Sequence, residues 1–261
     1  MTSWKALFFK EFMASKLWLY LNIAVILLGG LYFILFYHSS MVLQGLMFII
    51  VFHIVYLPIW IVYSLFSEWR ERAITHWYGL PHKGIVLISS KFVAGIAMML
   101  LSLLASSTVL VLLYTFFLGG IDPVIEEGSL WFIHNYWGVF LGIGIMAIYA
   151  GSQILCALFI GASVTRYKPV WIISFLLLPS LIQIWLRDRT LYETIARWGM
   201  FTSPSDQWLL PLLQYDYEVF KLATVLSKVT VFSLGVMGPQ LVISLLLVWI
   251  SSKLLDRYVH I

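Results

Sequence analysis

Residues that carry out chemistry do not occur here in the patterns of a known catalytic or metal site. The chain of 261 residues contains no G-x-x-x-x-G-K-[ST] run, so it lacks the phosphate-binding loop of many nucleotide hydrolases. It contains no H-E-x-x-H run, and its single cysteine, Cys156, excludes a disulfide scaffold and a zinc site built from several cysteines. We therefore assign no catalytic residue and no metal ligand.

Polar side chains within apolar runs are the remaining candidates. Ser152 follows a glycine, as in an intramembrane serine hydrolase, but small residues in such runs usually serve close helix packing. His53 is an ionisable residue in mid-run and hence a functional candidate, although a hydrogen bond to a neighbouring helix is the favoured interpretation. We apply the same two interpretations, interhelical hydrogen bonding first and lining of a substrate pathway second, to a set of five residues: Asn22, His53, Gln153, Gln183 and Gln240.

The composition indicates a membrane protein. Hydrophobic residues make up 62% of the chain and charged residues only 11%, whereas soluble domains carry about 25% charged residues. Six runs contain no Asp, Glu, Lys or Arg and reach the ~17–25 residues that a helix needs to cross a bilayer. They lie at 17–37, 43–66, 92–118, 137–163, 170–186 and 236–252. The sequence therefore predicts an all-α membrane protein with six transmembrane helices, in a single domain over residues 1–261.

The distribution of charge predicts the orientation. With six spans, one side of the membrane holds both termini, residues 67–91 and residues 164–169, and carries 11 Lys and Arg against four acids. The other side carries five Lys and Arg, all within 187–235, against eight acids. Because basic loops stay inside the cell, both termini are predicted to be cytoplasmic. Topology accounts for the basic residues, so the net charge of +4 requires no nucleic-acid partner.

The densest charged stretch, residues 67–91, separates the second and third apolar runs. At about 100° per residue its first half forms a two-faced helix, which Pro81 ends. The polar face comprises Glu68, Glu71, Arg72, Thr75 and His76. Such a helix would lie along the cytoplasmic membrane face and offer charge to a partner. A solvated loop is the competing interpretation.

Two further segments are predicted to lie at the membrane surface. Residues 1–16 mix three lysines with aromatic residues and indicate an interfacial helix before the first span. Residues 187–235 are too long for a simple turn. Ser203-Pro204 reads as a helix start, and Lys221, Thr224 and Lys228 share one helical face. This segment is predicted to be either re-entrant helices or an external cap.

The order of these elements resembles the membrane-spanning permease subunits of type-2 ABC transporters, most of which are bacterial exporters. The resemblance covers the whole chain as architecture. At residue level it rests on Glu68, Leu80-Pro81, Lys91 at the opening of the third span, and Asp256-Arg257 in the tail.

The resemblance implies that the chain is not itself an enzyme and holds no cofactor. A separate ATP-binding cassette ATPase, in two copies, would bind ATP and magnesium. The coupling helix Glu68–Pro81 would contact it through Glu68, Glu71, Arg72, Thr75 and His76. Residues 187–235 would form the outer gate, with candidates Arg187, Asp206 and Trp208. Two permease subunits, identical or related, would enclose a route through the bacterial cell membrane for a hydrophobic or amphiphilic peptide, antibiotic or lipid.

Three other functions stay open. An intramembrane enzyme would need polar groups such as Ser152 and His53 at one depth. A secondary transporter would usually carry buried acids in mid-membrane, and the six runs contain none. A non-transporting immunity or sensor protein would show the same spans.

Overall fold

The structure is a computed structural model and describes residues 3–36, 39–70, 83–113, 123–164, 166–187, 198 and 234–259. Its elements are the helices α1 (Ser3–Ala14), α2 (Lys16–Phe36), α3 (Ser39–Arg70), α5 (Gly84–Leu113), α6 (Pro123–Ser163), α7 (Lys168–Arg187) and α11 (Leu234–Val259). These ranges contain no strand, so the predicted all-helical class is confirmed for them.

Several of these helices have the length and composition of membrane spans. Within the described ranges, four stretches are long and apolar enough to cross a bilayer: Trp4–Gly29, Gly84–Val109, Phe140–Ser163 and Gly235–Arg257. Lys168–Pro179 is a shorter apolar helix. The apolar helices indicate a multi-pass membrane protein. The described part of each predicted run lies in a helix, while passage of all six through the membrane stays a prediction.

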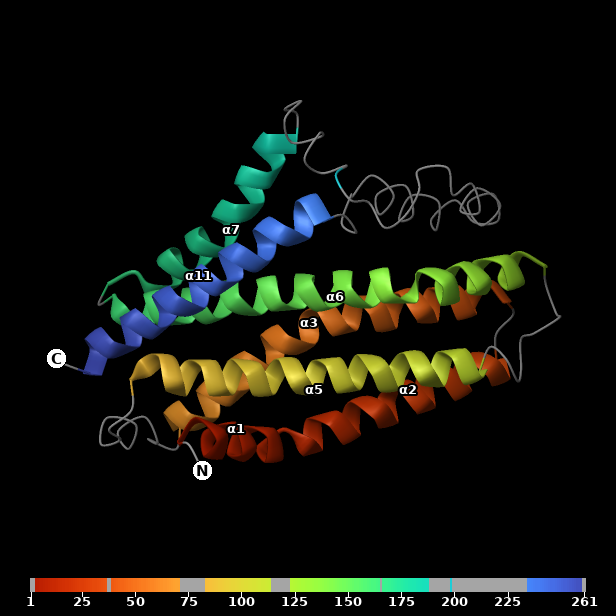
Figure 1. Cartoon of the computed structure of the whole chain (residues 1–261), viewed down its shortest axis with the longest axis horizontal. Helices are drawn as coiled ribbons and strands as arrows, with labels where there is room; N and C mark the ends of the chain where they lie inside the picture. The colour runs from red at the N-terminus through yellow and green to blue at the C-terminus, as the bar shows by residue number, and fades with distance from the viewer. Residues whose placement is uncertain are drawn as a thin grey trace.

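The helices lie mostly along one direction (Figure 1). α2, α3, α5 and α6 run side by side, α11 lies along α6, and α7 leans away from the bundle. The start of α1, the end of α3, the start of α5 and the end of α11 lie at the same end of the bundle. We call this the terminal end, since both chain termini lie there.

One predicted boundary is corrected at the terminal end. The stretch from Ser67 is predicted to begin a separate helix, but residues 67–70 are the last turn of α3. The N-terminal helix packs along α5, and its position at the membrane face stays a prediction. Ser15 alone separates α1 from α2, and its N–H still donates to the Glu11 carbonyl at 3.1 Å. α1 and α3 both continue through charged residues because those residues find buried partners. The apolar periodicity of one segment does not reveal such partners.

The core lies where α3, α5 and α6 meet. Leu57 of α3 is completely buried there, with Met98 of α5 and Ala147 of α6. Gly95 and Gly151 admit this approach: a Cβ at Gly95 would lie 2.8 Å from a Leu57 methyl carbon, and one at Gly151 would lie 3.0 Å from Leu57 Cγ. Small residues at helix contacts let membrane helices pack closely, so α3 is fixed between α5 and α6.

Candidate functional site

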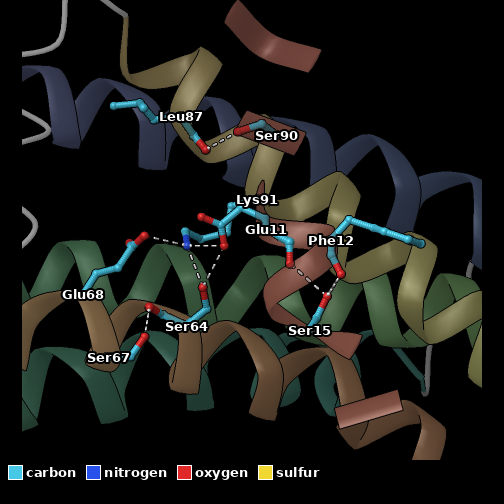
Figure 2. Close-up of polar contacts among 9 residues, drawn as sticks. All are labelled: Glu11, Phe12, Ser15, Ser64, Ser67, Glu68, Leu87, Ser90 and Lys91. Carbon is cyan, nitrogen blue, oxygen red and sulfur yellow. Dashed lines mark hydrogen bonds and ion pairs between the residues drawn. The ribbon is translucent and has the colours of Figure 1, made fainter. Parts of the chain in front are cut away.

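A buried charged cluster joins three helices at the terminal end (Figure 2). The Lys91 ammonium donates to Glu11 Oε2 at 2.8 Å, to Glu68 Oε1 at 3.1 Å and to Ser64 Oγ at 2.6 Å. The Ser64 hydroxyl in turn donates to Glu11 Oε2 at 3.5 Å. Because Glu11 lies on α1, Ser64 and Glu68 on α3 and Lys91 on α5, the cluster ties all three helices together. We call these four residues the Lys91 cluster.

The Lys91 cluster is shielded from solvent and not balanced in charge. The side chains of Lys91, Glu11 and Glu68 are only 6%, 11% and 12% exposed. One ammonium faces two carboxylates, so full ionisation leaves one negative charge in excess. Burial raises the pKa of Glu68 above its ordinary value; Lys91 opposes this shift, and the negative charge of Glu11 adds to it. The cluster can therefore hold helices together and take up a proton.

A second polar cluster lies farther from the terminal end and joins α3 and α5 to α2 instead of α1. Asn22 Nδ2 donates to Ser102 Oγ, and His53 Nε2 lies 3.1 Å from that oxygen. His53 Nε2 also lies 3.2 Å from Ser106 Oγ, whose hydroxyl donates to the Ser102 carbonyl at 2.6 Å. His53 Nε2 donates in these contacts when it carries the proton and accepts when it does not. We call Asn22, His53, Ser102 and Ser106 the Ser102 cluster; it joins α2, α3 and α5.

The two clusters occupy matching positions on their helices. Glu11 precedes Asn22 by 11 residues, Lys91 precedes Ser102 by 11, and Ser64 follows His53 by 11 on the antiparallel α3. Eleven residues make about three helical turns, or roughly 16 Å, and return to nearly the same face. Between them lie apolar residues such as Leu57, Ile61 and Met98, which are buried. The successive helices α1 and α2, together with α3 and α5, thus carry two polar layers separated by an apolar one.

A third contact joins the start of α5 to the end of α11. The Gly84 N–H donates to Asp256 Oδ1 at 2.7 Å, which satisfies one of the free N–H groups in the first turn of α5. A Cβ at Gly84 would lie 2.8 Å from the Ser252 carbonyl oxygen, so only glycine fits this approach without a shift. Segment 71–82 therefore has a fixed contact on each side. Glu68 binds Lys91 before the segment, and Gly84 binds Asp256 after it.

The structure brings together only some of the predicted site residues. Asn22 and His53 meet at Ser102, and Glu68 turns its carboxylate inward to Lys91. Gln153 is half-buried on α6, and the side-chain oxygen of Gln240 on α11 is buried without a hydrogen-bond partner in the described ranges. Outside the described residues lie Glu71, Arg72, Thr75, His76, Asp206 and Trp208, together with the side chains of Gln183 and Arg187.

Ser152, for which the sequence favours close helix packing over a catalytic role, makes a local hydrogen bond. It is completely buried, and its hydroxyl donates to the Tyr149 carbonyl of the same helix at 2.8 Å. The described residues contain no group of three His, Cys, Asp or Glu that could hold a metal ion.

Sequence reasoning did not identify Glu11, Ser64, Ser102, Ser106 or the contact of Asp256 with Gly84. A signal for the first three was present. In α3, in α5 and across the junction of α1 with α2, a polar residue recurs after 11 positions. Within one helix this spacing places both residues on one face. This pattern could have predicted two polar layers between the first three long helices. Asp256 and Gly84 are 172 residues apart, and no local pattern connects them.

Comparison of the chain with protein-family models, with curated proteins and with solved structures finds no match.

Proposed function

We propose that this chain is the transmembrane subunit of an ABC transporter that exports a hydrophobic or amphiphilic compound. In this proposal a separate ATPase, present in two copies, binds ATP and magnesium and supplies the energy, and a second permease subunit, identical or related, completes the pathway. The multi-pass helical architecture and the lack of a phosphate-binding loop in this chain support the proposal.

One observation carries the proposal: the helices on both sides of segment 71–82 are fixed at the terminal end. α3 is held through Glu68 and Lys91, and α5 through Gly84 and Asp256. A segment that transmits force from an ATPase needs ends that do not yield, and a loop between loosely packed helix ends would not transmit it. In the proposal Glu71, Arg72, Thr75 and His76 contact the ATPase.

The structure changes the role that we give to Glu68. Its carboxylate is 12% exposed and paired with Lys91 inside the chain, so we now propose that it positions the segment from within. Contact of Glu68 with the ATPase stays a prediction. The outer gate in 187–235, with Arg187, Asp206 and Trp208, and a cell-membrane location with both termini inside are also parts of the proposal.

The test reverses charge in segment 71–82 and leaves Glu68 unchanged. We would purify the tagged chain from a bacterial membrane, identify the retained ATPase by mass spectrometry and measure its ATP turnover in vesicles. Glu71→Lys with Arg72→Glu keeps the net charge and should lower ATPase retention. Breaking one desolvated pair costs about 2–5 kcal/mol, which corresponds to about thirtyfold or more in affinity.

Glu126→Lys serves as the control because Glu126 is predicted to lie on the other side of the membrane. This variant should retain the ATPase. Recovery of the wild-type chain without any ATPase, or wild-type retention by the Glu71/Arg72 variant, would contradict the proposed docking.

An intramembrane serine hydrolase is the second candidate, because His53 Nε2 lies 3.1 Å from Ser102 Oγ. One observation weighs against it: both residues are completely buried, whereas a serine nucleophile must be reached by its substrate. A fluorophosphonate probe that labels the wild-type chain but not Ser102→Ala would revive this candidate.

A further inference from the structure

The acids at the terminal end are all turned toward partners within the chain. Glu11 and Glu68 bind Lys91, and Asp256 accepts the Gly84 N–H. Within the described ranges, which do not include Glu71, these three are the only acids at that end. None of these three acids is fully exposed.

The basic residues at the same end face outward. Six of them are exposed on three separate elements: Lys5 and Lys10 on α1, Arg166 and Lys168 at the α6–α7 connection, and Lys253 and Arg257 in the last turns of α11. Arg70 and Lys83, beside segment 71–82, are exposed as well. Lys91 is the one buried cation at this end among the described residues. Every fully exposed charged side chain described at the terminal end is therefore a cation.

Exposed apolar side chains lie directly beside these cations. Phe9, next to Lys10, is 48% exposed; Trp171, one turn from Lys168, is 53% exposed. Trp249, one turn from Lys253, is 54% exposed, and the Lys253 ammonium lies 6.0 Å from the centroid of its ring. Exposed cations next to exposed tryptophans are typical of helices where they leave the hydrocarbon and enter the headgroup region.

We propose that the terminal end carries a binding surface for anionic phospholipid headgroups, formed by Lys5, Lys10, Arg166, Lys168, Lys253 and Arg257. The lipid is the occupant rather than an acidic protein or a nucleic acid because the cations lie on elements at two opposite flanks of the bundle. Figure 1 shows the start of α1 on one flank, and the start of α7 and the end of α11 on the other. A single macromolecule would need the cations on one face, whereas a leaflet reaches both flanks. This inference does not depend on the proposed transport function.

The experiment measures which lipids the full-length chain retains. We would reconstitute it in vesicles of equal parts phosphatidylcholine and phosphatidylglycerol, extract it in mild detergent and count retained headgroups by mass spectrometry. The wild-type chain should retain an excess of phosphatidylglycerol. Each cation at a headgroup contributes about fivefold in affinity at low ionic strength, and the excess should fall between ~50 mM and ~500 mM salt because screening shortens the range of the attraction.

Matched variants separate charge from shape. Replacing Lys5, Lys10, Lys168 and Lys253 together by glutamine should remove most of the excess, whereas replacing the same four by arginine should keep it. Circular dichroism and the melting temperature of each variant in detergent establish that it is folded. Equal retention of the two lipids by the wild-type chain, or an unchanged excess in the glutamine variant, would overturn the proposal. If the glutamine variant does not fold, the salt response of the wild-type chain decides: a phosphatidylglycerol excess that salt leaves unchanged would also overturn it.

Discussion

Glu11 and Lys91 are 80 residues apart in the sequence, and their side chains meet at 2.8 Å inside the bundle. This ion pair attaches the N-terminal helix to α5, and through Ser64 and Glu68 it also reaches the end of α3. Because the pair is almost fully shielded from water, neither partner can lose the other without leaving a buried charge. Stability of the terminal end should therefore depend strongly on Lys91.

Replacing Lys91 by methionine should lower the free energy of unfolding by about 3–5 kcal/mol, because two carboxylates then lose their buried cation. Denaturant unfolding in mixed micelles measures this loss. Lys253→Met is the matched control: Lys253 is exposed, and its replacement should change stability by no more than about 0.5 kcal/mol. Equal effects of the two substitutions would show that the Lys91 cluster does not hold the helices.

The Lys91 cluster should also make stability depend on pH through Glu68. Its pKa in the folded chain is raised, chiefly by burial, above the ordinary value of 4.5. The folded state therefore binds the proton more tightly than the unfolded state does. This contribution to stability is fully present below the ordinary pKa and is lost as the pH rises through the raised pKa of the folded state.

Glu68→Gln isolates that contribution because glutamine resembles the protonated acid and does not titrate. The free energy of unfolding of the wild-type chain should increase relative to that of Glu68→Gln as the pH falls from neutral toward 4.5. Unfolding curves of both proteins over this range give the difference. A difference that is constant with pH, or that changes in the opposite direction, would contradict the raised pKa.

The helical class and the positions of the long helices could be predicted from the sequence because a membrane excludes charge and requires long apolar runs. The ends of the helices could not. α3 continues through the charged residues 67–70 and α5 begins at Gly84, since Lys91 and Asp256 supply partners for charges and free N–H groups. Those partners come from α5 and α11, and a periodicity argument on one segment does not include them.

The same reason explains the mixed result for the candidate site. His53 and Asn22 stood out because polar residues are rare in apolar runs, and the structure joins them. Ser102 did not stand out, because serine is common in membrane helices and only its position opposite Asn22 and His53 gives it a role. The positions of Glu71, Arg72, Thr75 and His76 remain predictions.

Gly84→Ala should destabilise the contact between α5 and α11. The new methyl group would lie 2.7 Å from Asp256 Oδ1 and 2.8 Å from the Ser252 carbonyl oxygen, so the end of α11 must shift. Such overpacking costs about 1–3 kcal/mol. Gly238→Ala is the control: a Cβ there meets nothing within 4 Å, and alanine in a helix is favoured over glycine by about 0.5–1 kcal/mol. Thermal unfolding in micelles should give Gly84→Ala a lower melting temperature than the wild-type chain. Gly238→Ala should have the same melting temperature as the wild-type chain or a higher one.

The last prediction compares two serines that are equally buried but differ in their partners. Ser102 and Ser152 are both 0% exposed. The Ser102 hydroxyl connects α5 to Asn22 and His53 on two other helices, while the Ser152 hydroxyl donates only to a carbonyl of its own helix. Ser102→Ala should therefore cost about 1–2 kcal/mol, since interhelical hydrogen bonds in membrane proteins contribute roughly 0.6 kcal/mol on average and up to about 1.7.

Ser152→Ala removes the same oxygen atom without separating helices, so its effect should stay below about 0.5 kcal/mol. Unfolding in mixed micelles gives both values, and a double-mutant cycle of Ser102→Ala with Asn22→Ala isolates the contact between α2 and α5. We expect a coupling energy of about 0.6–1.7 kcal/mol. If the two serines have equal effects and the coupling energy is zero, the Ser102 hydroxyl does not join α2 to α5.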